Sequence, residues 1–124
     1  MIEPGKVTAF GGADDKGDSG ETASGVSTKL NPGIMGCALP MRRDASPQLR
    51  GSPIPKLPWQ TKVVFTAPTG QRITASLIDE GPAKWTKHIG DLTVAAARQF
   101  DQNATANDFG RTLSIRIIGG AKYA

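Results

Sequence analysis

Two acidic residues, Asp79 and Asp91, bracket one connection of the chain and could carry out acid and base chemistry together. Asp79 follows the apolar run 72–78 and precedes Gly81-Pro82, and Asp91 stands just before the small-residue segment 92–97. A carboxyl group delivers a proton near neutral pH only if burial or a nearby negative charge raises its pKa. Two acids in one groove meet this requirement, and such pairs are typical of glycoside cleavage.

Alternating apolar and polar side chains predict the strands that position these acids. The β-branched runs 61–66 and 72–78 are joined by Pro68-Thr69-Gly70, which predicts a hairpin. In its second arm Asp79 is expected on the same face as Leu77, at the rim of the core. Other strands or short apolar segments are expected at residues 6–10, 34–39 and 112–118.

Thr93 is a good N-cap for a short helix over residues 94–100, in which Val94, Ala97 and Phe100 would share the buried stripe. Five or six strands and one helix indicate a small β-barrel. The length of 124 residues indicates one domain that spans the whole chain, residues 1–124. Polar and proline-rich segments at 13–28 and 41–57 predict long surface loops.

Charge and composition narrow the classes of function. A net charge of +4 favours contact with polyanions, either nucleic acid or an anionic cell-wall polymer. The basic residues lack the interleaved aromatic residues that single-strand binders use. A single Cys37 and a single His88 exclude an internal disulfide and a zinc-type ligand set. Cys37 could act as a nucleophile with His88 as its base, but its apolar neighbours favour a core thiol.

Five segments resemble the double-psi β-barrel group, which includes rare lipoprotein A, expansins and a family of small barrel endoglucanases. The resemblance covers most of the chain and is strongest where an isoleucine, an aspartate and a leucine precede the helix. The segments are Val7–Gly12, Thr22-Ala23-Ser24-Gly25, Leu57–Val63, Ile78-Asp79-Glu80-Gly81-Pro82 and Ile89–Ala96. The resemblance implies a mainly β fold, a six-stranded double-psi β-barrel with one or two short helices and long loops.

The resemblance also implies roles for particular residues. Asp91 matches the aspartate associated with catalysis or polysaccharide engagement, and Asp79 matches a second aspartate of the group. Thr8 matches a threonine that lines the same groove. Phe10 replaces a nearby tyrosine or tryptophan, and Gly12 stands nearest to the position of an acid that the endoglucanases carry after the first strand.

Further residues are candidates for binding substrate. Asp14 lies in the acidic loop that follows Gly12, where solvated charge is the simpler interpretation. Trp85 could stack on a sugar face, whereas we expect Trp59 to pack in the core. His88 could donate to substrate or tune Asp91, or it could be an exposed loop histidine without a role.

The sequence departs from the double-psi β-barrel group at two further places, and both acids also have possible structural roles. Glu80 replaces an arginine, and Gly36-Cys37-Ala38 replaces the alanine-histidine step of rare lipoprotein A. Asp91 could also only stabilise the helix N-terminus, and Asp79 could only shape a turn.

Three functions are compatible with these residues. The leading hypothesis is a peptidoglycan lytic transglycosylase or related glycoside hydrolase that uses Asp91 as acid and base. The alternatives are an expansin-like polysaccharide-binding module that does not cut, and a protease-inhibitor or effector module on the same barrel.

The expected partners and location follow from these hypotheses. We expect a polysaccharide partner, peptidoglycan, with no cofactor, no metal, no nucleic acid, no membrane insertion and a monomeric state. We expect an extracytoplasmic or secreted location, and because this sequence shows no signal peptide, export would depend on a signal outside it or on a dedicated secretion system.

Overall fold

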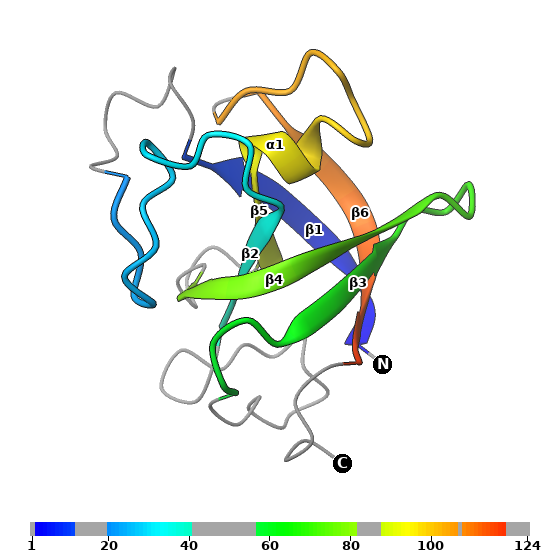
Figure 1. Cartoon of the computed structure of the whole chain (residues 1–124). Coiled ribbons are helices and arrows are strands. Elements are labelled where there is room, and N and C mark those ends of the chain that lie inside the picture. The colour runs from blue at the N-terminus through cyan, green and yellow to red at the C-terminus, as the bar shows by residue number, and fades with distance from the viewer. Residues whose placement is uncertain (1, 12–19, 41–56, 82–87, 107, 119–124) are drawn as a thin grey trace.

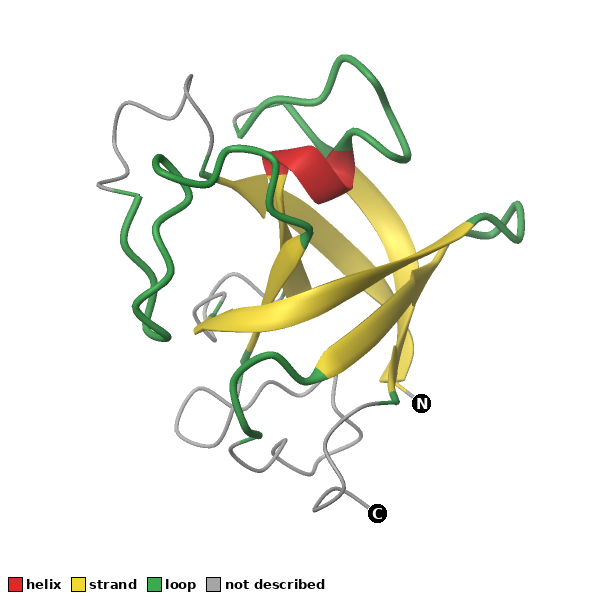
Figure 2. Ribbon diagram, in the orientation of Figure 1, coloured by secondary structure: helices red, strands yellow, loops and turns green. Residues whose placement is uncertain are grey.

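Six strands close into a barrel in the computed structural model, which describes residues 2–11, 20–40, 57–81, 88–106 and 108–118. The strand order around the barrel is β1-β5-β2-β4-β3-β6 (Figure 1). One helix, α1, lies at an end of the barrel against β1, β2 and β5 (Figure 2). The elements are β1 (Ile2–Phe10), β2 (Gly36–Leu39), β3 (Lys62–Thr66), β4 (Arg72–Glu80), β5 (Gly90–Thr93), α1 (Val94–Ala97) and β6 (Gly110–Ile117).

Parallel and antiparallel pairs are mixed in this barrel. β1 pairs with β5 and β2 pairs with β4 in parallel, and the other four neighbouring pairs are antiparallel. The mainly β fold with a small closed barrel is therefore confirmed. The β3–β4 hairpin is also confirmed, and its turn is closed by the Ala67 N–H, which donates to the Gln71 carbonyl at 2.7 Å.

The inward-facing residues of all six strands form one hydrophobic core. Its largest fully buried members include Phe65, Leu77, Leu92 and Ile115. Cys37 lies in this core, and burial raises the pKa of its thiol far above the ordinary range, so the prediction of a core thiol is confirmed. The prediction for Trp59 is also confirmed, because its half-buried side chain packs against the core.

Thr93 caps the helix as predicted. Its hydroxyl accepts from the Ala96 N–H at 3.4 Å and from the Gly36 N–H at 3.1 Å, and donates to the Ile34 carbonyl at 2.6 Å. The helix is shorter than predicted because its last residue is Ala97, and the chain then continues in a turn. Thr93 thus joins α1, β5 and the start of β2.

β5 was not predicted as a strand. Its residues Gly90–Thr93 contain a glycine and an acid, and they offer too short a run for alternation to be visible. The strand forms because it pairs on both sides, in parallel with β1 and antiparallel with β2. Asp91, which was expected between a connection and the helix, therefore lies on a strand that is paired on both sides.

A shift in the β2–β4 register corrects the predicted face of Asp79. Cys37 aligns with Leu77, but the next residue, Ala38, aligns with Asp79, so Ile78 is an extra residue in β4. A bulge of this kind turns the following side chains to the other face. Leu77 points into the core, and Asp79 lies on the outer face with Ala38.

The described part of the first predicted loop, residues 20–28, contacts β4. The Ser24 N–H donates to the Ile78 carbonyl at 3.1 Å, and the Thr28 N–H donates to the Gly20 carbonyl at 2.7 Å. Residues 13–19 and 41–56 of the two predicted loops lie outside the described residues. The described part of the chain has no helix long and apolar enough to cross a bilayer.

Candidate functional site

Four residues on the outer face of the barrel form a row across adjacent strands. Thr8 of β1 aligns with Asp91 of β5, Asp91 aligns with Ala38 of β2, and Ala38 aligns with Asp79 of β4. Residues that are aligned on neighbouring strands point to the same side of a sheet. The two acids predicted from the sequence are therefore on one face, separated by the strand that carries Ala38. We call these four residues the acid row.

Asp91 is half-buried and has two polar neighbours. The Thr8 hydroxyl donates a hydrogen bond to the Asp91 carboxylate. The Oγ1 atom of Thr8 also lies 3.5 Å from Nδ1 of His88, at the long limit of a hydrogen bond. Because the single Thr8 proton goes to Asp91, a hydrogen bond at this second contact requires a proton on Nδ1 of His88. The three side chains thus form a chain of polar contacts that ends at Asp91.

The environment of Asp91 raises the pKa of its carboxyl group. Burial is the largest cause, since it penalises the charged form. The Thr8 hydrogen bond and the positive charge of His88 lower the pKa, and the negative charge of Asp79 raises it, so the net shift is upward. Asp91 therefore keeps its proton at a higher pH than an exposed aspartate does, which suits a general acid.

Asp79 is held in place by backbone groups. Its Oδ1 atom accepts from the Ala23 N–H at 3.0 Å and from the Glu80 N–H at 2.9 Å. Ala23 belongs to a turn in which the Gly25 N–H donates to the Thr22 carbonyl at 3.0 Å. The hydrogen bonds from the Ala23 and Glu80 N–H groups fix the orientation of the Asp79 carboxylate in the acid row.

The contact between the Ala23 N–H and Asp79 was not predicted from the sequence. Ala23 acts through its backbone N–H, so its side chain carries no signal of the contact. The Thr22-Ala23-Ser24-Gly25 segment was noted only as a resemblance. Within it the Thr22 hydroxyl donates to the Val26 carbonyl at 2.7 Å, which closes the turn that presents the Ala23 N–H.

The other predicted site residues fall in different places. Phe10 is half-buried at the end of β1. It lies two residues after Thr8 and therefore on the same side of the strand. Glu80 is half-buried at the end of β4 and aligns with Leu39. Asp14 and Trp85 lie outside the described residues, so their predicted roles in binding substrate stay predictions.

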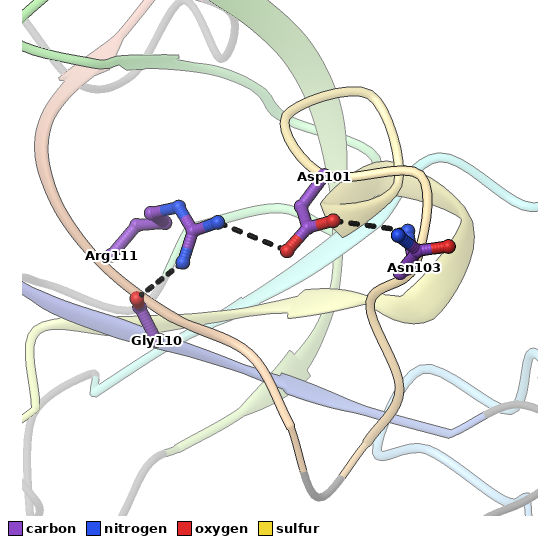
Figure 3. A network of polar contacts seen from close by, with 4 residues as sticks. All are labelled: Asp101, Asn103, Gly110 and Arg111. Carbon is purple, nitrogen blue, oxygen red and sulfur yellow. Dashed lines mark hydrogen bonds and ion pairs between the residues drawn. The ribbon is translucent and has the colours of Figure 1, made fainter.

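A second polar network supports the strand next to Thr8 (Figure 3). Arg111 donates to Oδ2 of Asp101 and to the Gly110 carbonyl, each at 3.0 Å, and Oδ1 of Asp101 accepts from the Asn103 N–H at 3.0 Å. Gly110 is the β6 residue that aligns with Thr8. These partly exposed contacts tie the 101–109 loop to the start of β6, beside the acid row.

The described residues contain no group of three or more His, Cys, Asp or Glu side chains that could hold a metal ion. Asp91, Thr8 and the neighbouring His88 instead offer a carboxyl group with a raised pKa, a hydroxyl and an imidazole. No known protein family and no curated protein matches the sequence. The closed barrel with two parallel pairs is compatible with the expected fold, and the double-psi assignment stays a prediction.

Proposed function

We propose that the protein acts on a cell-wall polysaccharide, peptidoglycan, with Asp91 as the acid and base. The observation that carries this proposal is the half-buried Asp91 carboxyl group, whose pKa is raised while Thr8 and His88 lie beside it on the outer face. A raised pKa at a polar site that faces outward is typical of a functional acid, because a purely structural carboxylate is usually stabilised in its charged form.

A double-psi barrel is the fold that this proposal requires. The parallel β1–β5 and β2–β4 pairs bring segments that are distant in the sequence side by side. Asp91 lies on β5, between β1 and β2 and shortly before α1, and the resemblance to rare lipoprotein A and the expansins implies a catalytic or substrate-binding aspartate before the helix. The Thr22–Gly25 segment, which carries the same resemblance, contacts Asp79.

One carboxyl group is sufficient for the proposed reaction. Protonated Asp91 gives its proton to the glycosidic oxygen as the bond from that oxygen to the anomeric carbon breaks. The resulting Asp91 carboxylate then takes the proton of the C6 hydroxyl of the same muramic sugar, whose oxygen bonds to the anomeric carbon. The products are a glycan with a new free hydroxyl and a 1,6-anhydro sugar, and Asp91 is protonated again. His88 and Thr8 position the carboxyl group and adjust its pKa.

A second candidate is an expansin-like module that binds polysaccharide without cutting it. The observation that favours it is the state of Asp79, whose Oδ1 atom already accepts two backbone N–H groups. A carboxylate held in this way is stabilised in its charged form and is less suited to proton transfer. The acid row would then bind sugar hydroxyls, with Asp91 as one of the acceptors.

Incubation with purified peptidoglycan sacculi distinguishes these functions. The wild type and Asp91→Asn are compared with Asp108→Asn, a control that removes an exposed acid outside the acid row. We expect 1,6-anhydro products from the wild type and the control, and a loss of at least 100-fold in Asp91→Asn. Binding to sacculi without products would favour the expansin-like module. Absence of both binding and cleavage would contradict the proposal.

A further inference from the structure

A second surface with defined chemistry lies away from the acid row. An open groove of about 720 Å³ runs over the outer face of β3, between β4 and β6. In the strand order of the barrel, β3 stands opposite β5, which carries Asp91. The groove therefore lies on the side of the barrel opposite Asp91, where it can bind a separate ligand or a separate part of the same polymer.

Two arginines stand on the two sides of this groove. Arg116 of β6 aligns with Val64 of β3, and Arg72 of β4 aligns with Thr66, the next outward residue of β3. Strands lie about 4.8 Å apart and outward residues repeat every two positions, so the two arginine Cα atoms are roughly 12 Å apart. Both arginine side chains are exposed. The two arginines therefore place a positive charge at each side of the groove, with the groove floor between them.

The residues of β3, β4 and β6 that line the groove include two arginines and no acidic side chain. The third cation on this face is Lys62, whose ammonium donates to the Ser76 hydroxyl at 2.6 Å. The floor between the arginines carries the hydroxyls of Thr66, Thr74 and Ser114. A surface with this charge attracts an anion, and its hydroxyls can exchange hydrogen bonds with a polar ligand.

We propose that this groove binds an acidic polysaccharide, whose carboxylates contact Arg72 and Arg116. The planar guanidinium group has two parallel donors that match a carboxylate. The hydroxyl-bearing floor would then face the sugar hydroxyls between two acidic groups. The choice of a polysaccharide among polyanions rests on the proposed function, and the charge of the ligand rests on the groove itself.

Two other classes of polymer fit this surface less well. The residues that line the groove include no aromatic side chain on which the bases of single-stranded nucleic acid could stack. A peptide that adds to a sheet as a strand needs a free edge, and each of the six strands already has two neighbours in the barrel. The groove therefore offers a ligand charged and hydroxyl side chains, together with the apolar side chains of Val64 and Ile118.

Binding to polygalacturonate tests the proposal with a defined polymer. We expect measurable affinity in titration calorimetry at low salt, and a loss of at least tenfold in the double variant Arg72→Gln/Arg116→Gln. The control Lys6→Gln/Lys29→Gln removes two exposed lysines that do not line the groove, and it should bind within twofold of the wild type. Polygalacturonate contains no muramic sugar, so its binding is measured independently of the proposed cleavage, and this result is separate from the test of the proposed function.

Amide chemical shifts of the wild type provide a second measurement that does not depend on a variant. Shifts on addition of polygalacturonate should concentrate in β3, β4 and β6, with few in β1 and β5. Equal loss in the lysine control, or shifts concentrated around Asp91, would overturn the proposal. Tighter binding of polyglutamate or polyphosphate than of polygalacturonate would also overturn it, because the ligand would then be another polyanion.

Discussion

Asp79 and Asp91 lie on the two strands that flank β2, and both align with the same residue, Ala38. Two strand spacings separate their Cα atoms by roughly 10 Å, and the small Ala38 side chain stands between them on the shared face. The negative charge of Asp79 acts on Asp91 from this position and raises its pKa. The two acids are thus coupled through space, while only Asp91 receives a hydrogen bond from Thr8.

Two substitutions of Asp79 should separate the effect of its charge on the pKa of Asp91 from the effect of its hydrogen bonds on stability. Asp79→Asn keeps the Oδ1 acceptor for Ala23 and Glu80 and removes the negative charge, so the pKa of Asp91 should fall with little change in stability. Asp79→Ala also loses both hydrogen bonds, which should cost about 1 to 2 kcal/mol in the free energy of unfolding. Carboxyl NMR titration and denaturant unfolding measure the two effects. Equal stability of both variants would contradict the positioning role of the Oδ1 contacts.

Thr8 should set the pH at which Asp91 loses its proton. Its hydrogen bond to the carboxylate lowers the pKa of Asp91, so Thr8→Val should raise that pKa further. If Asp91 is the general acid, the alkaline limb of the activity profile moves to higher pH. Thr8→Ser keeps the hydroxyl and is the matched control. A titration of Asp91 that is the same in the valine and serine variants would contradict this role.

The raised pKa of Asp91 should appear in the pH dependence of stability. A carboxyl group whose pKa is higher in the folded state than its ordinary value of about 3.9 stabilises the fold most when protonated. The free energy of unfolding of the wild type, relative to Asp91→Asn, should therefore be highest below this value. It should fall as the pH rises through the folded pKa, and then stay constant. A difference that increases with pH would contradict the upward shift.

Gly36 should tolerate no side chain at the start of β2. A Cβ atom there would lie 2.6 Å from Cδ1 of the fully buried Ile78 and 3.1 Å from Cγ2 of Thr93. Gly36→Ala should cost about 1 to 3 kcal/mol, because both neighbours are packed. At Gly33 a Cβ atom would meet nothing within 4 Å, so Gly33→Ala should stay within about 0.5 kcal/mol of the wild type. Chemical denaturation compares the two, and equal stabilities would be inconsistent with the packing at Gly36.

Elements whose signal lies in a short stretch of the sequence were predicted correctly from the sequence alone. The β3–β4 hairpin combines β-branched alternation with a Pro-Thr-Gly turn, and β6 alternates over residues 112–117, so both were found. The N-cap role of Thr93 was also visible, because it depends on one side chain and the residues just after it. The burial of Cys37 followed from its apolar neighbours.

Features that depend on pairing between distant segments could not be found in this way. β5 is a strand because β1 and β2 hold it on both sides, and nothing in its four residues requires extended structure. The bulge at Ile78 arises from the shift of β4 against β2, and it reverses the face expected for Asp79. The sequence showed that the two acids flank one connection. That both align with Ala38 on one face depends on the pairing of β4 and β5 with β2.

The closure of the barrel has a consequence for how this chain is synthesised. β6 is the last of the described strands in chain order, and it pairs with both β1 and β3. Until the ribosome has released residues 110–117, the nascent chain exposes unpaired backbone along those two strands, and most of its sheet contacts join distant segments. The barrel therefore cannot close before residues 110–117 have left the ribosome, and until then the chain is most exposed to aggregation and to chaperones.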